Sequence, residues 1–218
     1  ETEKQLYGES SPELAEGYSS LSTACLGMKE YDRAINYGNT ALKIIAGRET
    51  LYTEILADLY TNLGVCYIKL SDYSKAVLYL EKGEDVFREY NLRNDDKYIN
   101  LLNSLAAAYF FMGEQDKSDR YYEMGIDIAD AGNTFLSQNF VNSFAKIVGN
   151  SGNIEKGESI MLYSLKKAET RYGAGSWIYI YVLKNYADYL REFRIDAKRS
   201  LLLYEKCMDY LEMNKDDN

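Results

Sequence analysis

The chain contains no histidine, and this absence narrows the chemistry that it can perform. Without histidine neither a Ser-His-Asp triad nor a Cys-His pair can form, and most zinc and haem sites lose a usual ligand. The three cysteines, Cys25, Cys66 and Cys207, are odd in number and widely spaced. They therefore predict no disulfide framework and are typical of small buried thiols in a reducing compartment. We expect no enzyme activity, no metal site and no cofactor.

Proline and long apolar segments are also scarce. Proline occurs once in 218 residues, and folds rich in strands and turns usually need more of it at their loop corners. The sequence therefore favours helices joined by short turns. No apolar run approaches the roughly 20 residues that cross a bilayer. Because the sequence begins at Glu1 without a methionine, we expect it to be a piece of a longer protein, with a removed signal segment as an open alternative.

Basic residues are outnumbered by acidic ones, 25 to 34, which gives a formal charge of −9. Nucleic-acid binding requires clustered Lys and Arg that replace the counterions of the phosphates. Binding to anionic membranes requires the same kind of cluster. We therefore expect neither nucleic acid nor membrane as a partner. The lack of a disulfide framework leads us to expect a cytoplasmic location.

One pattern occurs five times along the chain. A small residue recurs at intervals of 42, 42, 39 and 43 residues: Ala34, Ala76, Ser118, Gly157 and Ser200. Ahead of Ala76, four residues follow helical spacing at i, i+3, i+4 and i+7: Tyr60, Leu63, Gly64 and Tyr67. Two apolar helical stretches in each period predict a repeated helical hairpin, with the small residue where its two helices cross.

The predicted repeats cover nearly the whole chain. Their approximate ranges are 12–50, 51–92, 93–132, 133–173 and 174–213, followed by a tail or linker at 214–218. Ser11 and Pro12 are expected to be the N-cap and the first residue of the first helix. Gly27, Gly113 and Gly152 are expected in turns that need a positive φ. The fifth repeat has an extra residue between Ala187 and Ser200.

The motif of the second repeat resembles the tetratricopeptide repeat family. It consists of Tyr60, Leu63-Gly64 and Tyr67, followed by Ala76, Leu80 and Gly83. The period near 42 is similar to that of the longer repeats in kinesin light chains and bacterial regulatory arrays. The resemblance implies an all-α fold, a right-handed superhelical solenoid of about five antiparallel helical hairpins. Such an array buries a continuous core and leaves a curved open surface.

The resemblance also implies where a partner would bind, along a concave face built from the first helix of each repeat. Transfer of the repeat register places the following residues there: Asn62, Lys69, Asn100, Asn103, Phe110, Phe111, Asn142, Lys146, Lys184, Asn185 and Asp188. An asparagine amide both donates and accepts hydrogen bonds, so it suits an extended peptide backbone. The alternatives are ordinary exposed polar side chains for the asparagines, and packing between repeats for Phe110 and Phe111.

The function expected from these features is that of a scaffold or regulatory module that binds a protein or peptide. The alternative is an intramolecular spacer or oligomerisation module that controls an effector domain of its own longer chain, such as a caspase-like peptidase or a signalling domain. The two differ in where the partner resides, in another molecule or downstream in the same one.

Overall fold

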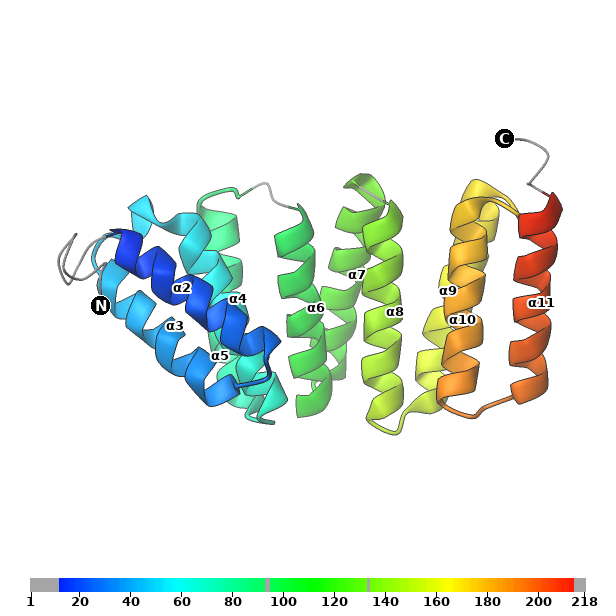
Figure 1. Ribbon diagram of the computed structural model, residues 1–218, viewed down its shortest axis with the longest axis horizontal. Helices are drawn as coiled ribbons and strands as arrows, with labels where there is room; N and C mark the ends of the chain where they lie inside the picture. Colours follow the sequence, from blue (N-terminus) through cyan, green and yellow to red (C-terminus); the bar gives the residue numbers. More distant parts are fainter. Residues whose placement is uncertain (1–11, 93–94, 133, 214–218) are drawn as a thin grey trace. The chain divides into compact units, whose positions relative to one another are not determined.

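The computed structural model describes residues 12–92, 95–132 and 134–213, and all regular structure in these ranges is helical (Figure 1). Their α-helices are α2 (Pro12–Gly27), α3 (Tyr31–Ile45), α4 (Thr53–Lys69), α5 (Tyr73–Glu89), α6 (Asp95–Met112), α7 (Gln115–Gly132), α8 (Thr134–Asn150), α9 (Ile154–Tyr172), α10 (Trp177–Glu192) and α11 (Ala197–Met213). A 3-10 turn, η1 (Glu49–Leu51), precedes α4. The predicted all-α fold is confirmed. Among these helices, none is both long and apolar enough to cross a membrane.

Consecutive helices pack as antiparallel hairpins, and the five hairpins close with the same turn. In each turn one residue takes a left-handed conformation: Lys29, Ser71, Gly113, Gly152 and Arg194, with φ between 52° and 95°. The backbone N–H that follows it donates to a carbonyl five residues earlier, as Asp72 does to Tyr67 at 2.9 Å. This bond satisfies a carbonyl that the end of the first helix leaves without a partner.

The glycine predictions are confirmed at two turns and wrong at one. Gly113 and Gly152 have φ of 80° and 95°, but the first turn uses Lys29, with a φ of 62°, and Gly27 is the last residue of α2. The bond from Glu30 N to Cys25 O places the left-handed residue two positions after Gly27. Pro12 begins α2, and Ser11 lies outside the described residues.

The small residues lie where the helices of a hairpin cross, and all five are buried. Ser118 Oγ donates to the carbonyl of Ala106 at 2.8 Å, and Ser200 Oγ donates to the carbonyl of Ala187 at 2.9 Å. A Cβ on Gly157 would lie 2.7 Å from the carbonyl oxygen of Ala145. Ser118 follows its partner by 12 residues and Ser200 by 13, so the extra residue of the last repeat is taken up between them.

The chain divides into two compact units, residues 1–121 and 122–218, with the boundary inside α7. The core of the first unit contains Ile45, Leu59, Leu80 and Leu105 from four successive helices, each at most 1% exposed. The second unit has its own cluster, in which Ala168 of α9, Tyr179 and Leu183 of α10, and Cys207 of α11 meet.

Candidate functional site

In the first unit, the first helices of successive hairpins are neighbours: α2 packs on α4, and α4 on α6. Polar side chains connect them. Asn62 Nδ2 donates to Thr23 Oγ1 at 2.9 Å, and Lys97 Nζ pairs with Asp58 Oδ2 at 2.6 Å. Asn100 takes in α6 the position that Asp58 takes in α4, six residues before the helix crossing, and it is exposed. We call the surface formed by Thr23, Asp58, Asn62, Lys97 and Asn100 the first-helix face.

The predicted binding residues of this unit are unequally accessible. Asn100 and Lys69 are exposed, whereas Asn62 and Asn103 are half-buried. Phe111 stacks on Tyr73 of α5 with ring centroids 4.9 Å apart, and Phe110 meets Phe111 edge-on at 5.7 Å. Packing against the preceding hairpin therefore accounts for the position of Phe111.

In the second unit, three of the predicted residues form ion pairs. Lys146 of α8 pairs with Glu192 of α10 at 2.7 Å, and Lys184 pairs with Asp188 at 2.7 Å. Burial acts to raise the pKa of Asp188, but hydrogen bonds from Lys184 and Tyr204 outweigh it and lower that pKa. The carboxylate is therefore ionised at neutral pH.

The two predicted asparagines of the second unit differ in their burial. Asn142 is half-buried in α8. Asn185 is only 6% exposed, although it shares its register with the half-buried Asn62 of α4. Of the predicted residues of α10, Lys184 and Asp188 are therefore more accessible than Asn185.

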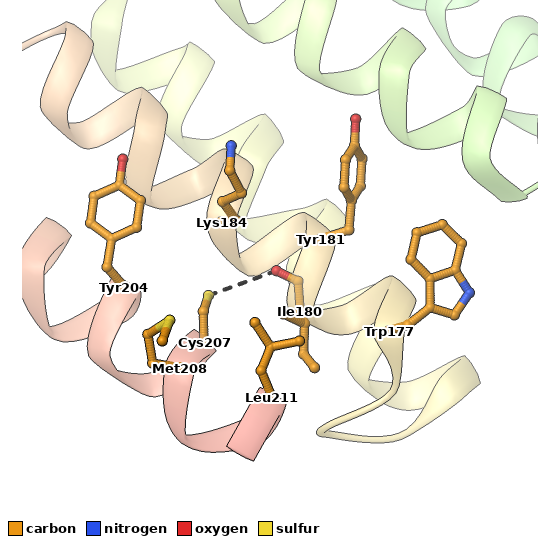
Figure 2. Close-up of a pocket in the computed structure, with 8 residues that line it drawn as sticks. All are labelled: Trp177, Ile180, Tyr181, Lys184, Tyr204, Cys207, Met208 and Leu211. Atoms are coloured by element: carbon orange, nitrogen blue, oxygen red, sulfur yellow. Dashed lines mark hydrogen bonds between the residues drawn. The ribbon is translucent and has the colours of Figure 1, made fainter. Parts of the chain in front are cut away.

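A pocket of about 410 Å³ lies between α10 and α11 (Figure 2). Helix α10 lines it with Trp177, Ile180, Tyr181 and Lys184. Helix α11 lines it with Tyr204, Cys207, Met208 and Leu211. Its surface is apolar although much of it faces solvent: Trp177 is 61% exposed, Met208 55% and Leu211 48%. Lys184 was predicted as a binding residue, but the pocket as a whole was not, although the spacing of Tyr204, Met208 and Leu211 signals a stripe on one helix.

The burial of the cysteines and the arrangement of possible metal ligands bear on the chemistry of the described ranges. Cys25, Cys66 and Cys207 are buried and free. Burial raises the pKa of the Cys66 thiol to about 11, and burial also raises that of Cys207. Both are therefore protonated at neutral pH, whereas nucleophilic cysteines need a thiolate. No group of three or more Cys, Asp or Glu side chains in the described part of the chain is arranged to hold a metal ion.

Comparison with known proteins agrees with the hairpin geometry. Residues 55–131 match the family model of the tetratricopeptide repeat. These residues are tetratricopeptide repeats. The match includes most of α4, all of α5 and α6, and most of α7, so it contains the motif that carried the resemblance. No curated protein sequence matches the chain.

Solved structures share the tetratricopeptide repeat fold over most of the chain. A putative kinesin light chain with nearly identical TPR-like repeats from Podosopora anserina has a TM-score of 0.61 and 14% identity, over 92% of this chain and 96% of that one. The apo form of RapI has a TM-score of 0.56 and 18% identity, over 94% and 85%. BtubC (BKLC) from P. vanneervenii has a TM-score of 0.54 and 17% identity, over 83% and 73%. At these identities the likeness shows the fold alone.

Proposed function

We propose that the chain is a protein-interaction module that binds a segment of a partner protein on its first-helix face. The observation that carries the proposal is the pair of bridges between neighbouring first helices, Asn62 with Thr23 and Lys97 with Asp58. They hold polar side chains in place across α2, α4 and α6, the first helices of three successive hairpins. A surface that is already ordered loses less conformational entropy when a ligand binds.

The chemistry of this face suits an extended backbone. An asparagine amide can donate to a peptide carbonyl and accept from a peptide N–H, which requires no particular side chain in the ligand. The exposed Asn100 of α6 is available for such contacts, and the half-buried Asn62 of α4, which donates to Thr23, belongs to the same face. Since the chain carries a net charge of −9, we propose a neutral or basic segment as the ligand.

The cellular setting that we propose is the cytoplasm. It is supported by the three cysteines, all free and buried, because cysteines in oxidising compartments are usually paired. A regulatory role follows if the bound segment belongs to an enzyme or a signalling protein. It also follows if that segment belongs to a domain of the same longer chain, and the experiment below separates these two arrangements.

The test selects ligands from a displayed library of random peptides and then compares matched variants. Asn62→Ala with Asn100→Ala removes two amides from the first-helix face, and a control pair, Lys43→Ala with Glu89→Ala, changes exposed residues on second helices. Since each lost hydrogen bond costs about 0.5–1.5 kcal/mol, we expect about tenfold weaker binding in the first variant and none in the control. Enrichment of no peptide would favour a ligand within the same chain, and equal binding by both variants would contradict the proposed face.

A further inference from the structure

Within each unit, the first helix of one hairpin covers the hairpin before it. On the second hairpin, α6 is the covering helix. Leu101 Cδ1 would lie 3.1 Å from a Cβ on Gly83, and the rings of Tyr98 and Phe87 are 5.1 Å apart. On the first hairpin α4 is the covering helix, and Leu63 lies equally close to Gly38. The hairpins therefore stack by inserting large side chains over small residues.

The covering helices share one spacing of large side chains, at i, i+3 and i+7. The three sets are Leu56, Leu59 and Leu63 in α4, Tyr98, Leu101 and Leu105 in α6, and Tyr179, Val182 and Tyr186 in α10. Except for the half-buried Tyr98, all are at most 4% exposed. This spacing places the three side chains along one face of a helix.

We call the positions of a hairpin that contact its covering helix the acceptor positions. The last hairpin also has them, but no described helix covers them. In the second hairpin, positions 4, 7, 8 and 11 after the crossing residue are Leu80, Gly83, Glu84 and Phe87, all buried. In the last hairpin they are Tyr204, Cys207, Met208 and Leu211, which line the pocket. Cys207 takes the position of Gly83 and is also small, so it leaves room for a covering side chain. Met208 and Leu211 are half exposed.

We propose that the pocket between α10 and α11 is a docking site for one amphipathic helix of a partner protein, which carries large apolar side chains at i, i+3 and i+7. This site is separate from the first-helix face and does not depend on it. Helix-in-groove binding of this kind uses the same packing as the stacked hairpins themselves. The partner helix packs on the last hairpin as α6 packs on the second hairpin.

A second copy of this chain fits the pocket less well as the source of a covering helix. Helix α2 of a second copy would present Leu14, Gly17 and Leu21 at the three positions, so it lacks the middle side chain. Its Leu14 is also already buried, at 6% exposure.

Charge further defines the partner helix. On the second hairpin, Asp58 of the acceptor pairs with Lys97 of the covering helix at 2.6 Å. Of the residues that line the pocket, Lys184 is the charged one, and although it pairs with Asp188 at 2.7 Å its side chain is 57% exposed. An acidic residue beside the apolar stripe of the docking helix would therefore complement Lys184.

The test measures fluorescence anisotropy of a labelled peptide with the sequence of residues 95–109, which holds Tyr98, Leu101 and Leu105 and begins with two aspartates. Its control is the same peptide with Leu101→Ser and Leu105→Ser. The full chain is compared as wild type, as Met208→Asp in the pocket, and as Leu202→Asp. Leu202 is a matched control because it is 62% exposed on the same helix outside the pocket.

We expect the wild type and Leu202→Asp to bind the peptide equally, and Met208→Asp to bind about tenfold more weakly or not at all. The doubly substituted peptide should not bind. Absence of binding to the wild type, or equal binding by Met208→Asp and Leu202→Asp, would overturn the proposal. So would a dimer in sedimentation velocity that Met208→Asp dissociates, since a second copy would then be the occupant.

Discussion

The second and the last hairpins carry the same acceptor positions with opposite exposure. Phe87 is 4% exposed beneath α6, whereas Leu211, at the corresponding position of α11, is 48% exposed. The residues differ little in hydrophobicity, so the difference comes from the helix that follows. In a repeat array each hairpin supplies only half of an interface, and its neighbour supplies the other half.

The two hairpins also differ in the residue at position 8 after the crossing residue. Glu84 accepts a hydrogen bond from the Tyr121 hydroxyl at 2.9 Å, so the covered hairpin satisfies a buried carboxylate with a neighbouring side chain. The last hairpin has Met208 there, with no group that needs such a partner. A covered acceptor can therefore be polar if its neighbour completes it, whereas the open acceptor is adapted to apolar contact.

The comparison predicts its largest effect when the side chain at position 11 after the crossing residue is truncated to alanine. Phe87→Ala should lower the free energy of unfolding by about 3–5 kcal/mol because it opens a cavity under Tyr98. Leu211→Ala should lower it by less than about 1 kcal/mol, since half of that side chain already faces water. Urea denaturation followed by circular dichroism measures both. Similar losses in the two variants would show that α11 is covered in solution.

An intermediate effect is expected at alkaline pH. Burial, and then the hydrogen bond to Glu84, raise the pKa of Tyr121 well above its usual value of about 10. A raised tyrosine pKa stabilises the fold below pH 10, and this stability is lost as the pH rises towards the folded-state pKa. We expect the free energy of unfolding to fall progressively as the pH rises above about 10.

Exchange of the two residues at position 8 tests this cause. Glu84→Met should reduce the alkaline loss by less than about 1 kcal/mol, because the carboxylate is removed while the burial of Tyr121 remains. Met208→Glu should leave the alkaline loss unchanged, since it adds an exposed carboxylate on the last hairpin. Urea titrations at a series of pH values provide the data. An equal change in both variants would argue against the Tyr121–Glu84 bond as a cause.

The smallest effect is expected from the bridge between α4 and α6. The side chains of Asp58 and Lys97 are both 38% exposed, so Asp58→Asn should cost only about 0.2–1 kcal/mol and less in high salt. The pair Lys184–Asp188 within α10 serves for comparison and should contribute about 0.3–0.5 kcal/mol. A loss above about 2 kcal/mol at Asp58 would mean that the bridge contributes far more to holding the two hairpins together than an exposed pair does.

The sequence predicted the hairpin fold because each crossing must use a small residue, which recurs at intervals of 39 to 43 residues. Ala76 and Gly157 could be recognised by that spacing alone, and both are buried. The left-handed residue of the first turn could not be recognised, because the bond from Glu30 to Cys25 determines its place. Lys29 accepts φ of 62° in an exposed turn, although glycine would do so at lower energy.

The site was harder to predict because accessibility depends on neighbours that lie far apart in sequence. Asn62 and Asn185 share a register, yet only Asn62 keeps part of its side chain in solvent. Met208 and Leu211 have the spacing of core residues. No described helix covers them, and the sequence of α11 alone does not reveal this. A repeat motif identifies which face of a helix is apolar, but the next element decides whether that face is interior or surface.

The most direct test of an open acceptor on the last hairpin uses Trp177, the one tryptophan of the chain, which lines the pocket and is 61% exposed. The peptide of residues 95–109 contains no tryptophan, so emission reports the pocket alone. If the account is right, the peptide shifts Trp177 emission to shorter wavelength and protects it from acrylamide in the wild type and Leu202→Asp, but not in Met208→Asp. Unchanged emission at peptide concentrations that saturate the anisotropy signal would contradict it.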